Sequence, residues 1–238
     1  MFLAQAFKIQ NKVSAAAIDL LDIAGLQVWL KRDTGITHSP VLGVASVSEW
    51  LDQTTNNNDF SQSRDSDKPR YTTGGKIAFD GIDDNLQLGG ELNLGTFTIC
   101  IAMNPDETGT LSNDSPLGKG GNDVIKMYRG GDDERIALKA NGVQSEINPM
   151  SEAFPTSQFL LTCIRNAAGL FIVRINGTQV GTVATDVTDL FDILQIGSGD
   201  ISNTQFSGTL NEFAIWNVEL SGSDLTNAET DIISRNAI

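Results

Sequence analysis

The chain has 238 residues, of which 19% are charged, and its 23 glycines and 6 prolines are typical of a turn-rich globular protein rather than a disordered chain. Its formal net charge is −14, and residues 175–238 hold nine acids against one base, Arg235. Such an anionic surface opposes contacts with phosphate, which excludes nucleic acid as a partner.

The sequence has no apolar run of 18 residues, and its start, MFLAQAFKIQ, lacks a basic region ahead of an apolar stretch. We therefore expect neither a membrane partner nor a signal peptide.

The sequence pattern predicts that the first 25 residues form an arm ahead of the main domain. Residues 13–24, VSAAAIDLLDIA, place apolar side chains on one helical stripe, and Gly25 stands where such a helix should end. We expect a short N-terminal helix here, and a division of the chain into an arm, 1–25, and a domain, 26–238. The arm begins with an apolar group that we expect to contact a partner: Phe2, Leu3 and Phe7. The alternative is that the apolar face of the arm docks on the sandwich itself.

The sequence from residue 27 to about residue 220 reads as short strands separated by clusters of Gly, Asn and Asp, which predicts antiparallel pairing. Its clearest hairpin is GLFIVRINGTQVGTV, residues 169–183, because Phe171, Val173 and Ile175 alternate to one face. The Asn176–Gly177 pair then supplies the positive φ angles of a tight turn.

Beyond residue 220 the stretch SGSDLTNAETDIISR offers a serine cap followed by Leu225, Ala228 and Ile232 at helical spacing. This pattern predicts a short C-terminal helix. Cys100 and Cys163 each lie in an apolar run, which favours buried free thiols over a disulfide, although a single bridge between them stays open.

Four stretches together resemble the laminin G-like branch of the concanavalin A-like lectin and glucanase sandwiches, over roughly residues 26–235. They are VWLKRDT at 28–34, EWLDQTTNNNDFSQSRDSDKPRY at 49–71, IAFDGIDDNLQL at 77–88, and LQIGSGDISNTQFSGTLNEFAIWNVELSGSDLTN at 194–227. The resemblance implies an all-β fold, a jelly-roll sandwich of two antiparallel sheets flanked by the short N-terminal and C-terminal helices. It implies no single function, since such sandwiches include glycan binders, adhesion modules, glycosidases and virion parts.

The acidic stretch FDGIDDN is interpreted as the turn of a hairpin in which Ile77, Phe79, Leu86 and Leu88 point inward. Asp and Asn side chains stabilise turn backbones, so the carboxylates need no ion to account for them. The alternative is a calcium site, because calcium prefers several oxygen ligands on flexible loops. Its ligands would be Asp80, Asp83 and Asp84.

A glycan-binding site would use an exposed aromatic ring beside groups that hydrogen-bond to hydroxyls. Trp29 and Trp50 stand among apolar neighbours and are expected in the core. Tyr128 lies between two glycine-rich turns, where a ring on a loop could face solvent, with Asp132 and Asp133 next to it. We prefer the interpretation of Tyr128 as an ordinary surface tyrosine, with the glycan-binding role as the alternative.

Catalysis is not expected. Retaining glucanases of the resembled superfamily carry two glutamates around an aspartate on one strand, whereas the comparable strand here, LNEFAIW, has only Glu212. His38 is the sole histidine and has no nucleophile motif beside it, so a Ser-His-Asp triad is not expected. A zinc site is not expected either, because the chain has one histidine and its two cysteines lie in separate predicted strands.

The sequence therefore predicts a non-catalytic structural or adhesion protein, and our first hypothesis is a component of a phage virion made in the host cytoplasm. It would decorate a capsid or belong to a tail appendage, form a homo-oligomer and contact surface glycans. The alternative is a free-standing carbohydrate-binding module, and a divergent glycosidase comes third.

Overall fold

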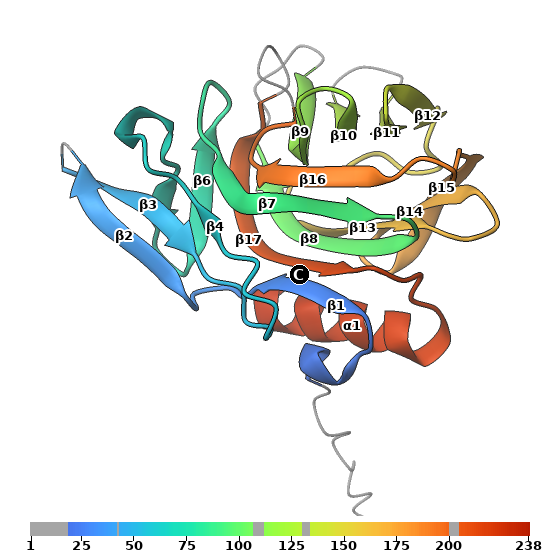
Figure 1. Cartoon of the computed structure of the whole chain (residues 1–238), viewed down its shortest axis with the longest axis horizontal. Helices are drawn as coiled ribbons and strands as arrows, with labels where there is room; N and C mark the ends of the chain where they lie inside the picture. The colour runs from blue at the N-terminus through green and yellow to red at the C-terminus, as the bar shows by residue number, and fades with distance from the viewer. Residues whose placement is uncertain (1–18, 42, 107–111, 130–133, 200–204) are drawn as a thin grey trace, which may run out of the picture.

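The computed structural model describes residues 19–41, 43–106, 112–129, 134–199 and 205–238 (Figure 1). Within these ranges the chain consists of antiparallel β-strands, two short 3-10 helices and one α-helix at the C-terminus. The strands form a two-layer jelly-roll sandwich, which confirms the predicted fold. The helices are η1 (Leu20–Asp22), η2 (Asp65–Asp67) and α1 (Gly222–Asn236).

One layer of the sandwich is centred on the long strand β17, which pairs with β8 on one side and with β1 on the other. The register continues from β8 through β13 and β14 to β15, with each neighbour antiparallel. The bounds of these strands are β1 Leu26–Leu30, β8 Phe97–Pro105, β13 Phe159–Arg165, β14 Leu170–Ile175, β15 Thr178–Ala184 and β17 Ser207–Trp216.

The opposite layer runs in the order β4, β7, β16, β9, β10, β11 and β12, again antiparallel throughout. Short turns of Gly and Asn connect β9 to β10 and β11 to β12, as the sequence pattern predicts. The bounds are β4 Phe60–Ser61, β7 Leu86–Leu94, β9 Ser112–Lys119, β10 Asp123–Arg129, β11 Arg135–Ala140, β12 Val143–Ile147 and β16 Phe191–Ile196.

A third group of strands joins the two layers at one end of the molecule. Strand β3 pairs with β2, β4 and β5, and β6 lies between β5 and the first half of β17. Figure 1 shows the β2–β3 hairpin projecting from the sandwich on the left. The bounds are β2 Ile36–Val41, β3 Val44–Trp50, β5 Arg70–Thr72 and β6 Lys76–Asp80.

The predicted hairpin at FDGIDDN is wrong, because its two strands do not pair with each other, but the prediction of which side chains face the core is confirmed. Strand β6 pairs with β5 and β17, whereas β7 pairs with β4 and β16, so residues 81–85 connect the two layers instead of closing a hairpin. Ile77, Phe79, Leu86 and Leu88 are nevertheless all buried. The alternation of apolar and polar residues determines which side chains of a strand face the core. It does not determine the partner strand, because two strands in opposite layers show the same alternation as two strands of one hairpin.

The main core fills the space between the layers and contains side chains from both. The hairpin at 169–183 contributes Phe171, Val173 and Ile175 to it, as predicted. At the tip of that hairpin Asn176 and Gly177 have φ angles of 49° and 81°. These values are typical of a tight two-residue turn and confirm the predicted hairpin.

A second core lies between α1 and the outer face of the β1–β17–β8–β13 layer, below β1 in Figure 1. Helix α1 buries Ala228 and Ile232 there, which confirms the predicted C-terminal helix, although Ser221 makes no side-chain cap hydrogen bond. Leu20 and Ile23 pack into the same core. Of the predicted N-terminal helix, residues 13–18 lie outside the described part, and residues 20–22 form η1, which Asp19 caps.

Several single-residue predictions concern burial. Trp29 and Trp50 are buried, as expected. Cys100 and Cys163 are buried free thiols, so the open alternative of a bridge between them is wrong. Thr162, the neighbour of Cys163, is the residue that faces Cys100 across β8 and β13, which places the two thiols on opposite faces of the layer. None of the described helices has the length and apolar character needed to cross a membrane.

Candidate functional site

The acidic turn that joins β6 to β7 brings its three aspartates together. Carboxylate oxygens of Asp80, Asp83 and Asp84 lie within 4.8 Å of one another. The backbone N–H of Asp80 donates to Asp84 Oδ2 (2.9 Å), and the N–H of Ile82 donates to Asp80 Oδ1 (2.8 Å). The aspartates therefore hold their own turn through side-chain to backbone hydrogen bonds, as the turn interpretation predicts.

Asp84 is the buried member of this turn, with 5% of its surface exposed. Its pKa is raised from 3.8 to about 7, mainly by burial and in second place by the nearby charge of Asp80. The pKa of Asp83 is also raised, by desolvation first and by the Asp80 charge second. Three clustered oxygens match part of the donor set that calcium uses, which takes six to eight in all. The calcium site stays a prediction.

Tyr128 differs from its prediction. It belongs to strand β10, not to a loop, and is half-buried. It lies opposite Arg135 of β11, whose guanidinium carbon is 4.4 Å from the centre of the tyrosine ring. One face of the ring is thus covered by a cation, which leaves less of it for a sugar. The other two predicted glycan-binding residues, Asp132 and Asp133, lie outside the described residues, as do Phe2, Leu3 and Phe7 of the arm.

Glu212, the nearest candidate for a catalytic carboxylate, is fully buried in the second core. Its Oε1 accepts hydrogen bonds from Trp29 Nε1 (2.8 Å) and Arg235 Nη2 (2.8 Å). Its Oε2 accepts one from Asn236 Nδ2 (2.7 Å). The carboxylate therefore connects β17 to β1 and α1, and none of its surface is exposed.

His38 is exposed on β2, where its ring stacks on Tyr71 with the ring centres 4.2 Å apart. The hydroxyl of Tyr71 donates in turn to Asp33 Oδ1 (2.6 Å), and this bond raises the tyrosine pKa. Among the described residues no serine hydroxyl is hydrogen-bonded to His38. The arrangement gives no sign of a nucleophile with its base.

The sequence interpretation missed a polar cleft of about 360 Å³ that several connections form together. Asn93 comes from the end of β7, Asp123 from the start of β10, and Asn141 from the turn between β11 and β12. The remaining side chains come from the β15–β16 connection and the start of β16. We call this the polar cleft, and its lining is Asn93, Asp123, Asn141, Thr188, Asp189, Leu190 and Asp192.

Hydrogen bonds position the walls of the polar cleft. Asp123 is the most buried of its lining side chains, at 6% exposed, and its Oδ1 accepts from the backbone N–H of Asn141 (2.8 Å). Asn93 Nδ2 donates to Asp192 Oδ1 (2.7 Å). Within the described part of the chain, neither the carboxylate of Asp189 nor the side-chain amide of Asn141 has a hydrogen-bond partner. The cleft thus offers a ligand the carboxylate of Asp189 and the side-chain amide of Asn141, between walls that hydrogen bonds hold in place.

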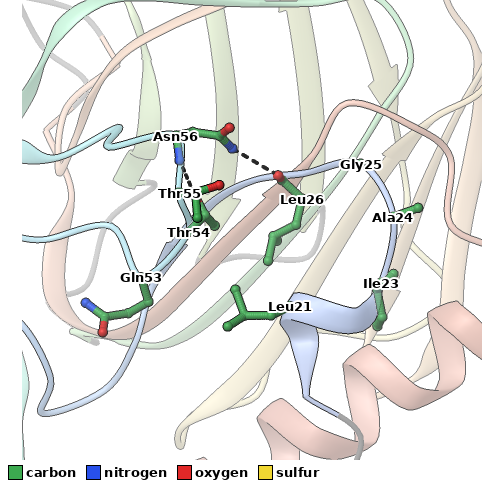
Figure 2. Close-up of a pocket in the computed structure, with 9 residues that line it drawn as sticks. All are labelled: Leu21, Ile23, Ala24, Gly25, Leu26, Gln53, Thr54, Thr55 and Asn56. Atoms are coloured by element: carbon green, nitrogen blue, oxygen red, sulfur yellow. Dashed lines mark hydrogen bonds between the residues drawn. The ribbon is translucent and has the colours of Figure 1, made fainter.

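A second cavity, of about 330 Å³, lies between η1 and the loop after β3. Figure 2 shows that Leu21, Ile23 and Leu26 form one wall of this cavity and that residues 53–56 form the other. Two polar groups of the loop are occupied, since Asn56 Nδ2 donates to the carbonyl oxygen of Leu26 (3.1 Å) and Thr54 Oγ1 donates to Asp52 Oδ2 (2.6 Å). Leu21, Ile23 and Leu26 give this cavity an apolar wall, whereas Leu190 is the one apolar side chain among the described residues that line the polar cleft.

The two-layer sandwich of antiparallel strands is the fold of lectin-like domains. Sequence comparison places residues 79–226 in the family described as the concanavalin A-like lectin/glucanases superfamily. The chain belongs to this family, as its motifs suggested. No curated protein sequence matches the chain.

Solved structures share the fold at low sequence identity. The ligand-binding domain of botulinum neurotoxin serotype D in complex with N-acetylneuraminic acid aligns over 88% of this chain and 50% of its own, with a TM-score of 0.56 and 14% identity. The binding domain of Paraclostridial Mosquitocidal Protein 1 aligns over 90% of this chain and 52% of its own (TM-score 0.58, 13% identity). A Trypanosoma rangeli sialidase aligns over 90% and 34% (TM-score 0.59, 15% identity). The chain thus spans about half the length of the toxin domains and a third of the sialidase.

Proposed function

We propose that this protein is a non-catalytic carbohydrate-binding module and that the polar cleft is its glycan-binding site. The observation that supports this most directly is the set of free polar groups in the cleft. The Asp189 carboxylate can accept hydrogen bonds from two neighbouring hydroxyls, and the Asn141 amide can both donate and accept. Convergent polar groups in a concave site are the usual means by which a protein fixes the orientation of a small ligand.

Family membership agrees with this proposal without requiring it, since one fold serves many functions. The neurotoxin serotype D domain is described with a bound sialic acid, but this chain matches only half of that domain. The comparisons give no support to the virion hypothesis and favour its alternative, a carbohydrate-binding module. The predicted homo-oligomer stays a prediction.

The absence of catalysis is part of the proposal. The one carboxylate that matches the position of a glucanase strand, Glu212, is engaged by Trp29 and Arg235. Retaining hydrolysis needs two carboxyl groups about 5 Å apart with the glycosidic bond between them. A fully buried carboxylate under a helix cannot take part in such a pair.

The proposal is tested by a glycan array followed by isothermal titration of the glycans that bind. Two variants remove free groups from the cleft, Asp189→Ala and Asn141→Gly. Glycine tolerates the positive φ of 46° that Asn141 adopts, so this change should keep the turn. We expect each variant to weaken binding at least about tenfold, or about 1.4 kcal/mol. The matched control is Asp224→Ala, an exposed position on α1. Binding that both cleft variants retain would place the site elsewhere.

A further inference from the structure

The charges in and around the polar cleft bear on which glycans it can take. Three carboxylates line it, those of Asp123, Asp189 and Asp192. Among the described residues that line the cleft there is no lysine, arginine or aromatic side chain. The lining therefore has hydrogen-bond acceptors in excess and no cation to offset their charge.

The lysine nearest to this lining already has partners. Lys119 Nζ donates to Glu91 Oε2 (2.7 Å) and to Asp192 Oδ2 (3.1 Å), and these two bonds raise its pKa. One cation between two carboxylates leaves this group with a net negative charge. Lys119 thus fixes Asp192 in place without giving the cleft a positive charge.

The second nearby cation, Arg165, is fully buried and does not line the cleft. Its Nε donates to the carbonyl oxygen of Gly95 (2.6 Å), and its Nη2 donates to that of Leu94 (2.5 Å). Burial lowers the pKa of this guanidinium, and the nearby charges of Asp123, Asp186 and Asp189 oppose that shift. This guanidinium reduces the negative potential beneath the cleft. Its Nε and Nη2 donate to the backbone around the β7–β8 turn, and its Nη1 has no hydrogen-bond partner among the described residues, but the whole side chain is buried and none of it lines the cleft where a ligand would bind.

From this arrangement we propose that the polar cleft binds uncharged saccharides and discriminates against those that carry a carboxylate. An acidic sugar would bring a further negative charge beside Asp123 and Asp189 with no cation to pair with it, and like charges a few ångströms apart repel even in water. A neutral sugar meets the same carboxylates with hydroxyl donors, which the excess of acceptors suits. Such repulsion is a common basis of specificity, because it acts against the wrong ligand.

This inference rests on the proposed function, and the two can fail separately in one experiment. The full chain is titrated with matched pairs of glycans, such as lactose and sialyllactose or a glucoside and the corresponding glucuronide, chosen after the array. We expect the neutral member to bind at least about tenfold more tightly, or about 1.4 kcal/mol. Added salt should narrow this ratio, because it screens the repulsion.

The variant Asp189→Asn removes one charge and keeps the shape of the side chain, so it should reduce the preference for the neutral member at least about threefold, or about 0.7 kcal/mol. The control Asp224→Asn should leave the preference unchanged. If the acidic member binds equally well or better, the charge-based inference is overturned while glycan binding stands. If the array yields no ligand at all, the proposed function fails and this inference fails with it.

Discussion

The carboxylate of Glu212 on β17 lies against the guanidinium of Arg235 near the end of α1, with Oε1 and Nη2 2.8 Å apart. Glu212 is fully buried, and Arg235 also lies over the ring of Trp29, 5.2 Å from its centre. The charged side chain of Glu212, in the middle of β17, thus holds α1 against the outer face of this layer. Its hydrogen bonds with Trp29, Arg235 and Asn236 hold α1 and β1 against β17.

The first prediction concerns this pair. We expect the purified chain to release no reducing sugar from β-glucan, and Glu212→Gln to lower the free energy of unfolding by about 3 kcal/mol, because it leaves the Arg235 guanidinium without its buried partner. Chemical denaturation and a reducing-sugar assay measure the two effects. Hydrolysis by the parent chain that disappears in Glu212→Gln would show that the carboxylate is catalytic after all.

The second prediction tests the inward packing of β6. Phe79 is 2% exposed and its ring meets that of Phe206 edge-on, with the ring centres 6.1 Å apart. We expect Phe79→Ala to cost about 3 to 5 kcal/mol of unfolding free energy through the lost burial and the cavity left behind. Ile82→Ala serves as the control, since Ile82 is 72% exposed in the following turn and should change stability by less than about 0.5 kcal/mol. Equal melting curves for Phe79→Ala and the parent would contradict the packing.

Sequence alone predicted the fold class and the faces of the strands, because alternation and turn residues are local signals. Phe171 and Val173 follow a period of two, and Asn176–Gly177 marks its turn, so this hairpin needs no knowledge of the rest of the chain. The partners of β6 and β7 could not be predicted in this way. Which strand lies beside β7 depends on the layer to which each strand belongs, and the local pattern is the same in both cases.

The polar cleft was missed for a related reason. Asp123 follows a glycine-rich turn signal, Asn141 is the first residue of an Asn–Gly pair, and Asp189 lies in a polar connection, so every segment was recognisable as a turn. Their convergence is a property of the β9–β10–β11–β12 meander beside β16, which sequence spacing does not reveal. Glu212 was likewise assessed as a catalytic candidate because its partner, Arg235, lies 23 residues further along the chain.

The third prediction is a pH dependence due to Asp84. The pKa of this carboxyl is raised from 3.8 to about 7 in the folded protein. Between about pH 4 and about pH 7 the carboxyl of Asp84 therefore keeps its proton in the folded state and releases it in the unfolded state. The contribution of Asp84 to the free energy of unfolding is therefore greatest below about pH 4 and falls as the pH rises through about 7. We expect this group to account for a loss of about 2 to 4 kcal/mol across the window.

Denaturant titrations at pH 4 and pH 8 measure the effect of Asp84. The variant Asp84→Asn keeps an oxygen that can accept from the N–H of Asp80 but cannot ionise. It should therefore be less destabilised than the parent when the pH is raised from 4 to 8. A parent and a variant that lose equal stability between these pH values would show that the Asp84 pKa is not raised.

The fourth prediction separates the bare turn from a calcium site at the same aspartates. Since Asp80 and Asp84 already accept hydrogen bonds from the turn backbone, we expect millimolar calcium or a chelator to change the melting temperature little. Calcium that bound only the folded state would instead add about 2.7 kcal/mol at a hundredfold excess over its Kd. A melting temperature that falls with chelator in the parent, and no longer does so in Asp83→Ala and Asp84→Ala, would establish the ion.

The last prediction concerns where the folded domain begins. Leu20 is fully buried and Ile23 is 5% exposed, and both pack with Trp216 beneath α1. Losing a buried leucine or isoleucine costs about 2 to 5 kcal/mol each. A chain that starts at Asp19 should therefore melt close to the full-length protein, whereas one that starts at Gly25 should melt far lower or fail to fold. Thermal unfolding of the two truncations measures this difference. If the Gly25 chain is as stable as the Asp19 chain, η1 contributes nothing to the second core, and the boundary between arm and domain belongs at residue 25.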